Sequence, residues 1–246
     1  MHYPNKKILI AFIIVIVYAI ALNEWNIHSI RKINPSGEIL NARLLVYNSA
    51  IYSVDNEWYL PQIKNFIAGN GFTSNVNREH YDVRRTPVYP IFYGFHYLIF
   101  GEKNSFYFIR FTQILIFALA TLALYFATFN FTKNKKIAIL AASIFGFNPT
   151  LVSYLYFTIT EALSPALVCF VLYFLSKSFV KNNKKNWFLT GLFFAIASLC
   201  RPAIFFFAPA LFFAIIYINR STFKRILLSG FIVALGVITL FLPHVI

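Results

Sequence analysis

The acidic residues of this 246-residue chain are concentrated in one stretch. Seven of the eight lie between positions 23 and 105, which is also the only sustained polar part of the sequence. Two of them, Asp55 and Glu57, stand at the beginning of a mixed polar and apolar run that ends at Gly69, Asn70 and Gly71. This pattern predicts a short amphipathic helix with both acids at its start, where a carboxylate can cap the helix and complement its dipole. Their oxygens could also bind a divalent metal, but no spaced third ligand accompanies them.

A pair of arginines, Arg84 and Arg85, offers a second kind of chemistry. Guanidinium donors match phosphate oxygens in a fork, so the pair suits a phosphate beside a membrane. The alternative is nonspecific contact with anionic headgroups. The aromatic run that follows, residues 91–100, is too short to span a membrane. It predicts an interfacial segment that holds four polar-tipped rings at headgroup level: Tyr89, Tyr93, His96 and Tyr97.

Glu161 and Arg201 are charged residues embedded in apolar sequence. Ser164 and Pro165 resemble a helix start, which predicts that Glu161 lies at the outer mouth of a membrane crossing. A charge at the bilayer centre would cost about 2.5 to 3.5 kcal/mol, so the mouth is the favoured place. Arg201, followed by a proline, predicts a turn on the same side of the membrane. Such a convergence of acid and base fits either a site or a stabilising ion pair.

These residues must be positioned by membrane helices, because 59% of the chain is hydrophobic and only 12% is charged. Five apolar stretches are long enough to matter. The third, residues 137–176, is long enough for two crossings. The fourth, residues 188–218, is broken by Arg201 and Pro202 into two short helices or a re-entrant pair. We therefore expect an all-α, polytopic transmembrane helix bundle with about seven crossings. The stretches are Ile8–Leu22, Ile114–Phe129, Ile137–Ser176, Phe188–Ile218 and Ile226–Leu242.

The basic residues orient these crossings. Four short segments hold twelve lysines and arginines and no acid, and they alternate with the outer segments without exception. An excess of Lys and Arg in short loops marks the cytoplasmic side, so the N-terminus is expected inside and residues 23–105 outside. The four segments contain Lys6 and Lys7; Lys133, Lys135 and Lys136; Lys177, Lys181, Lys184 and Lys185; and Arg220, Lys224 and Arg225.

The same composition excludes several classes of protein. The net charge of +14 does not indicate nucleic-acid binding, because the basic residues lie between apolar runs and not on one polar face. Two cysteines, Cys169 and Cys200, are too few for a disulfide scaffold. Residues 8–22 could also be read as a cleaved signal peptide, which would leave the downstream topology unchanged. We expect one membrane domain over 1–246, with a first crossing at 8–22, an extracytoplasmic loop at 23–105 and the remaining crossings at 106–246.

The order of these motifs resembles that of the polytopic GT-C glycosyltransferases. The motifs are the acids of the outer loop, the sequence Arg85-Thr86-Pro87-Val88-Tyr89-Pro90, the aromatic run that ends at Phe100-Gly101, Arg110, Asn148-Pro149, Thr160-Glu161 and Leu199-Cys200-Arg201-Pro202. The nearest branch looks like the relatives of protein mannosyltransferases and the lipid A aminoarabinose transferase. The resemblance covers roughly residues 50–245.

The resemblance implies a function and a site. The family transfers a sugar from a polyprenyl-phosphate carrier to an acceptor hydroxyl (of a glycan, lipid or protein) outside the cytoplasm, here at the bacterial inner membrane. An acid in the first outer loop is its catalytic hallmark, which carries over to Asp55. Many members have adjacent Asp and Glu there, whereas Asn56 separates Asp55 from Glu57 in this chain. Arg85, with Arg84 or Arg201, would neutralise the departing phosphate, and Glu161 and Tyr89 are further candidates for the site.

Two other interpretations compete with an active transferase. Family members generally have more crossings, and the last residues resemble a Leu-Pro-Trp element with His244 in place of Trp, so we expect a truncated or split member. A noncatalytic membrane subunit is therefore the main alternative. A flippase or transporter is the third, but such proteins need a polar path near the midplane. The carboxylates of this chain instead crowd the outer loop.

Overall fold

The computed structural model describes residues 6–33, 45–46, 50–51, 56–73, 85–220 and 222–241. The regular structure of the described part is helical apart from two short antiparallel strands, β1 (Leu45–Val46) and β2 (Ala50–Ile51), which confirms the all-α membrane architecture. The helices are α1 (Lys6–Ile33), α2 (Asn56–Ile67), α3 (Val88–Thr132), α4 (Lys135–Gly146), α5 (Pro149–Tyr154), α6 (Thr160–Val180), α7 (Lys184–Cys200), the 3₁₀ helix η1 (Pro202–Phe207), α8 (Ala208–Asn219) and α9 (Phe223–Phe241).

Five described segments are long and apolar enough to cross a membrane: Lys6–Ser29, Asn104–Thr132, Thr160–Val180, Pro202–Asn219 and Phe223–Leu240. α4 and α7 are shorter, with 12 and 17 residues. The prediction of seven crossings counts both of them and stays a prediction. The expected break at Arg201 and Pro202 is confirmed, because it separates α7 from η1 and α8.

One predicted helix start is wrong, and the first helix is longer than the expected crossing. α1 continues past Leu22 to Ile33, so eleven residues of the expected outer loop are helical, and the bounds of the crossing stay a prediction. α6 begins at Thr160 and contains Pro165 in its interior. Proline so near a helix start removes one backbone hydrogen bond, to the carbonyl of Glu161, which the apolar helix tolerates. Glu161 therefore lies in the first turn of α6 and not before it.

The chain forms two compact units. Unit 1 comprises residues 1–118 and 146–163, and unit 2 comprises residues 119–145 and 164–246. Unit 1 contains α1, α2, α5 and the first part of α3, and unit 2 contains α4, α7, η1, α8, α9 and most of α6.

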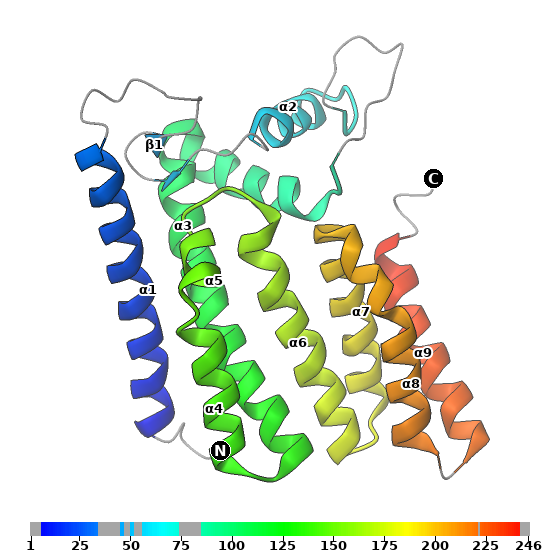
Figure 1. The fold of residues 1–246 in the computed structure, drawn as a ribbon. Helices are drawn as coiled ribbons and strands as arrows, with labels where there is room; N and C mark the ends of the chain where they lie inside the picture. Colours follow the sequence, from blue (N-terminus) through cyan, green and yellow to red (C-terminus); the bar gives the residue numbers. More distant parts are fainter. Residues whose placement is uncertain are drawn as a thin grey trace. The chain divides into compact units, whose positions relative to one another are not determined.

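In unit 1, α1 lies beside α5 (Figure 1). The buried amide of Asn23 fixes this contact, because its Nδ2 donates to the carbonyls of Ala19 (2.8 Å) and Val152 (2.9 Å). The hydroxyl of Tyr18 donates to the carbonyl of Phe147 (3.2 Å), and the two rings meet edge to face at 5.2 Å. Polar contacts of this kind join helices where lipid tails provide no hydrophobic drive for helix association.

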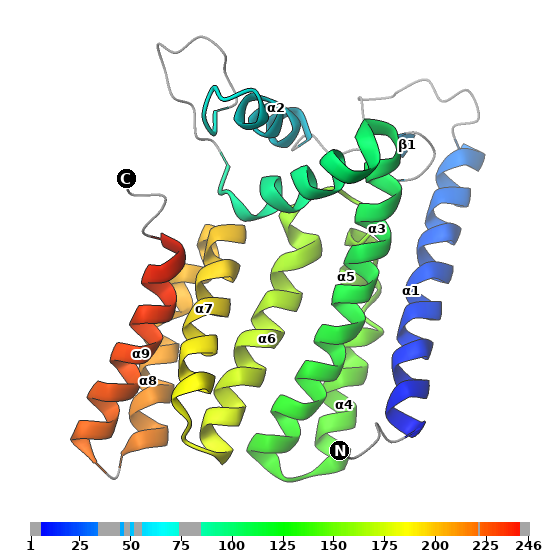
Figure 2. The ribbon, with the colours of Figure 1, turned by 180° about the vertical axis from the view of Figure 1, so that it is seen from behind.

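α3 is two helices joined at Gly101, whose φ of 72° and ψ of 172° are open to glycine alone. The first part, residues 88–100, runs crosswise to the part after Gly101, as Figures 1 and 2 show. α2 packs on this crosswise helix so closely that a Cβ on Gly94 would lie 2.7 Å from the Ile63 side chain. Gly69 and Gly71 adopt positive φ just after α2, as the predicted glycine turn requires.

In unit 2, α7 and α9 cross through two glycines. A Cβ on Gly191 would lie 2.1 Å from the carbonyl oxygen of Val233, and one on Gly236 would lie 2.4 Å from that of Phe188. Small residues at such crossings let membrane helices approach backbone to backbone. Next to the crossing, Leu175, Trp187, Ile215 and Val233 form a buried cluster that draws on α6, α7, α8 and α9.

Candidate functional site

A buried chain of contacts ties together four segments of unit 1. The Tyr59 ring of α2 packs on the Tyr89 ring at the start of α3, with 4.9 Å between centroids. The Tyr89 hydroxyl donates to Oε1 of Gln113 (2.8 Å), further along α3. Nε2 of Gln113 donates to the carbonyls of Leu155 (2.7 Å) and Phe157 (3.2 Å), in the connection between α5 and α6. All five residues are buried or half-buried, so this network is a rigid internal frame.

The frame positions three of the predicted site residues. Glu57 lies in the first turn of α2, two residues before Tyr59. Arg85 is half-buried and precedes Tyr89 by four residues. Glu161 follows Phe157 by four residues and accepts a hydrogen bond from the Thr160 hydroxyl (3.1 Å). The start of α2, which carries Glu57, the start of α3, which Arg85 shortly precedes, and the segment that leads to Glu161 are thus joined by buried contacts.

The remaining predicted site residues stand apart from this frame. Asp55 and Arg84 lie outside the described residues. Arg201 belongs to unit 2, where it ends α7 and its backbone N–H donates to the carbonyl of Ala197. Tyr89 is fully buried and its hydroxyl is engaged by Gln113, so in this structure it holds the frame together.

Of the four rings expected at headgroup level, Tyr89, Tyr93 and His96 are buried among protein side chains and so are not available to headgroups. Both ring nitrogens of His96 lie at hydrogen-bond distance from unit 1 groups, the Phe92 carbonyl (2.8 Å) and the Thr112 hydroxyl (2.9 Å). The exposed face of helix 88–100 is apolar instead: Ile91, Phe95, Leu98 and Ile99. The helical period places the polar-tipped rings on the buried face of this helix, and the aromatic content of the run does not predict which face is buried.

A charged cluster in unit 1 was not predicted as a site. Nη1 of Arg110 lies 3.3 Å from Oε1 of Glu24, and the Tyr156 hydroxyl donates to the same oxygen (2.9 Å). The guanidinium also lies over the rings of Tyr156 (4.5 Å) and Tyr107 (5.2 Å). The Arg110 side chain is only 15% exposed, whereas that of Glu24 is 52% exposed. Part of the signal was present in the sequence, since Arg110 stands next to a long apolar run and Glu24 directly follows the apolar stretch Ile8–Leu22.

The electrostatics of this cluster keep Tyr156 neutral. Burial is the largest influence on its hydroxyl and raises the pKa above the ordinary tyrosine range. The positive charge of Arg110 lowers the pKa, and the hydrogen bond to the Glu24 carboxylate raises it. The Tyr156 hydroxyl therefore remains a donor at physiological pH, and the cluster leaves one half-exposed carboxylate beside a shielded guanidinium.

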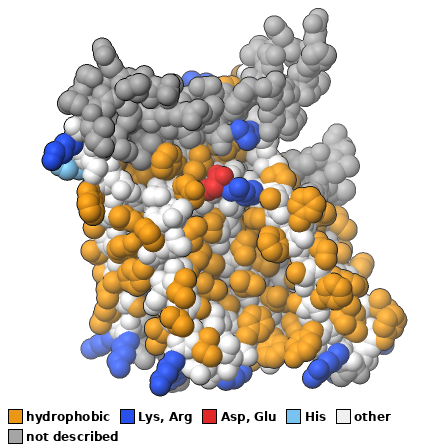
Figure 3. Space-filling view, in the orientation of Figure 1, with side chains coloured by type: hydrophobic (Ala, Val, Ile, Leu, Met, Phe, Trp, Pro, Cys, Tyr) orange, Lys and Arg blue, Asp and Glu red, His pale blue; other side chains and the backbone are white. Residues whose placement is uncertain are grey.

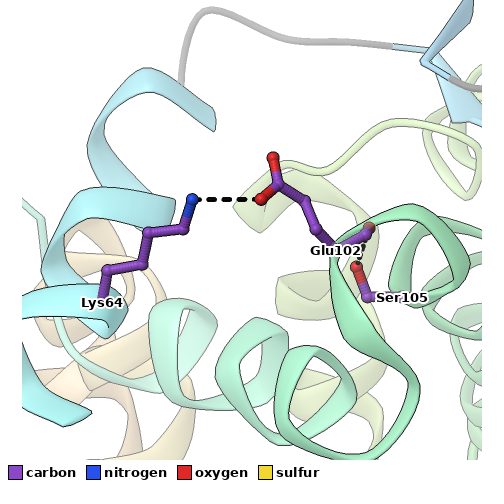
Figure 4. A network of polar contacts seen from close by, with 3 residues as sticks. All are labelled: Lys64, Glu102 and Ser105. Atoms are coloured by element: carbon purple, nitrogen blue, oxygen red, sulfur yellow. Dashed lines mark hydrogen bonds and ion pairs between the residues drawn. The ribbon is translucent and has the colours of Figure 1, made fainter.

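A second ion pair fastens α2 to the bend in α3. Nζ of Lys64 lies 3.0 Å from Oε2 of Glu102, and the Ser105 hydroxyl donates to the Glu102 carbonyl (2.7 Å), as Figure 4 shows. Both charged side chains are nearly half exposed, so the pair contributes little to stability. Its position next to Gly101 makes it a geometric tie between α2 and the crosswise helix.

Metal binding was left open by the sequence. Within the described ranges, no group of three His, Cys, Asp or Glu side chains is arranged to hold a metal ion. Asp55 is not among these residues, so a divalent metal at Asp55 and Glu57 stays a hypothesis.

Comparison with known proteins decides the family. Residues 84–246 match the family model described as dolichyl-phosphate-mannose-protein mannosyltransferase. The chain belongs to this family. It is therefore a multi-pass membrane protein of the GT-C glycosyltransferase superfamily, as the resemblance implied. Comparisons with curated proteins and with solved structures found no match.

The matched region contains most of the residues described above. Arg84, Arg85, Tyr89, Glu161 and Arg201 all lie within it. Asp55, Glu57 and the Glu24 carboxylate lie before it. The family match thus covers the basic residues of the predicted site but not its two loop acids.

Proposed function

We propose that this protein transfers a sugar from a polyprenyl-phosphate donor to an acceptor hydroxyl on the extracytoplasmic face of the bacterial inner membrane. The observation that carries the proposal is the family match over residues 84–246, in a chain whose buried frame joins the segments bearing Glu57, Arg85 and Glu161. The acceptor class, whether glycan, lipid or protein, is left to experiment.

The reaction asks for one base and for neutralisation of one leaving group. The acceptor oxygen bonds to the anomeric carbon as the bond between that carbon and the phosphate oxygen breaks. The acceptor proton passes to a carboxylate, for which Asp55 is our candidate and Glu57 the second. The polyprenyl phosphate leaves as an anion without needing a proton. A positioned base typically contributes about 10² to 10⁴ in rate.

The arginines supply the opposite charge. Arg85 precedes the frame residue Tyr89 by four positions, so a phosphate bound by it would be held against a rigid element. We assign Arg85 as the main phosphate ligand, with Arg84 and Arg201 as further candidates. A guanidinium binds phosphate through a planar fork that lysine lacks.

The test is transfer of a radiolabelled sugar from a polyprenyl-phosphate donor in membranes that contain the full chain. Asp55→Asn should abolish most transfer while leaving the amount of protein unchanged. Asp82→Asn, which removes another carboxylate of the same loop, is the matched control and should retain activity. Equal activity in the two variants would refute the assignment of Asp55 as the base.

The phosphate role has its own comparison. Arg85→Ala should raise the donor concentration needed for half-maximal rate, and Arg85→Lys should restore it only in part. An unchanged donor dependence would refute the role of Arg85. A wild-type chain that transfers nothing above background would overturn the proposal in favour of a noncatalytic subunit, and solute uptake into vesicles would favour a transporter.

A further inference from the structure

Unit 2 has a strongly one-sided charge. Its residues include eleven lysines and arginines and no Asp or Glu, because every acid of the chain lies in unit 1. Ten of the eleven flank three short connections: α3 to α4, α6 to α7, and α8 to α9. All ten side chains are exposed: Lys133, Lys135, Lys136, Lys177, Lys181, Lys184, Lys185, Arg220, Lys224 and Arg225.

The three connections lie at one end of unit 2. Nδ2 of Asn182 donates to Oδ1 of Asn219 (2.9 Å), which joins the α6–α7 connection to the end of α8. Nδ2 of Asn130 donates to the Ser176 hydroxyl (3.0 Å), which joins the end of α3 to the end of α6. Figure 1 shows the α6–α7 and α8–α9 connections at the same ends of their helices. The ten cations therefore form one surface, which we call the basic end of unit 2.

The basic end is held in place by buried polar contacts. The Trp187 indole N–H donates to Oδ1 of Asn182 (2.6 Å), and Nδ2 of Asn219 donates to the Ile215 carbonyl (3.0 Å). Trp187 and Asn219 are each 1% exposed. The basic side chains are thus carried by a fixed scaffold, which lowers the entropy cost of binding a ligand.

Six of the ten cations stand at helix starts, against the electrostatic preference of the helix, while the other four stand at or just after helix ends. Lys135 and Lys136 begin α4, Lys184 and Lys185 begin α7, and Lys224 and Arg225 stand in the first turn of α9. A helix start carries partial positive charge and favours acids. Mutual repulsion among the ten cations, and the dipoles at the three helix starts, are relieved when anions from outside bind to the basic end.

The depth of these residues identifies the partner. Most of them adjoin the apolar segments Thr160–Val180, Pro202–Asn219 and Phe223–Leu240. The three connections that they flank are only two or three residues long. Residues at the ends of membrane-spanning helices lie at the level of the lipid headgroups. Two of the cations also lie over tyrosine rings, Lys177 over Tyr173 (4.9 Å) and Arg220 over Tyr217 (5.1 Å). In Figure 3, apolar side chains cover the flanks of the helices, and Lys and Arg side chains gather along the lower edge.

We propose that the basic end of unit 2 is a binding surface for the phosphate groups of anionic phospholipids, centred on the Asn182–Asn219 hydrogen bond between the α6–α7 and α8–α9 connections. Phosphate diesters at headgroup depth supply the missing negative charge, and lysines near such a surface each add to the affinity. None of the ten cations belongs to the proposed sugar-transfer site, so this proposal does not depend on that one.

The test measures binding of phosphatidylglycerol to the full chain purified in a neutral detergent. Native mass spectrometry counts the retained lipids, and titration into mixed micelles gives the affinity, with phosphatidylcholine as the zwitterionic comparison. We expect retention of phosphatidylglycerol in preference to phosphatidylcholine. The double variant Lys184→Gln, Lys185→Gln should bind phosphatidylglycerol about thirtyfold more weakly, and Lys184→Arg, Lys185→Arg should bind it like the wild type.

The matched control is Lys6→Gln, Lys7→Gln, which removes two lysines from the start of α1 in unit 1. This variant should retain near wild-type affinity. Equal losses in the two Gln variants would show a general charge effect and overturn the proposal. Equal retention of phosphatidylcholine would also overturn it. Binding of inorganic phosphate as tight as that of phosphatidylglycerol would overturn it as well, because it would indicate a site for the free ion.

Discussion

The glycine crossing of α7 and α9 allows a sharp test of the packing in unit 2. Gly191→Ala would place a Cβ 2.1 Å from the Val233 carbonyl oxygen, and Gly236→Ala would place one 2.4 Å from that of Phe188. Real Cβ atoms essentially never come closer than 3.0 Å to another heavy atom. Since the obstructing atoms belong to the backbone, the helices themselves would have to separate by more than half an ångström.

The expected cost follows from two opposed effects. Alanine in place of glycine favours a helix by up to about 1 kcal/mol. Overpacking costs about 1 to 3 kcal/mol, and here no flexible side chain can move away. We therefore expect Gly191→Ala and Gly236→Ala each to destabilise unit 2 by about 1 to 2 kcal/mol. For a chain of this size, that lowers the midpoint of thermal unfolding by about 2 to 8 °C.

Gly230 is the matched control, because it lies in the same helix as Gly236 and a Cβ there would meet nothing within 4 Å. Gly230→Ala should leave the unfolding midpoint unchanged or raise it slightly through helix propensity. The assay is thermal unfolding of each purified variant in the same detergent, followed by the loss of monodisperse protein. If all three variants unfold at the same temperature, α7 and α9 do not cross as described.

Three further substitutions test unit 1 by the same unfolding assay. Gly101→Ala should cost about 1 to 3 kcal/mol, because the φ of 72° and ψ of 172° exclude alanine although a Cβ would have free space; an unchanged midpoint would contradict the bend. Tyr89→Phe should cost about 1 to 3 kcal/mol, because it leaves Oε1 of Gln113 buried without its donor, and a neutral result would mean that the frame is open to water. Glu24→Gln should cost less than about 1 kcal/mol, because the carboxylate is half exposed and the amide can still accept from Tyr156; a larger loss would show that Arg110 depends on that charge.

The sequence by itself determined the class of protein and the main breaks in its helices. Apolar runs of about twenty residues leave the backbone no alternative to helices in a membrane, and the structure contains such helices. The start of α2 near Glu57, the glycine turn after it and the interruption at Arg201 were predictable because glycine, proline and isolated charges act locally. The family likewise followed from the order of short motifs and is confirmed over residues 84–246.

The tertiary structure decided what the side chains touch. The sequence assigned Tyr89 to the headgroup level, but the pairing of α2 with helix 88–100 buries it against Tyr59 and Gln113. The charges of Glu24 in α1 and Arg110 in α3, 86 positions apart in the sequence, meet only in the folded protein, where the Tyr156 hydroxyl also donates to Glu24. Local patterns could not predict such contacts, because they depend on how separate helices pack and not on the period or composition of any one of them. The basic loops served in the sequence only to orient the crossings. In the structure, hydrogen bonds between helix ends join the three loops of unit 2 into one surface.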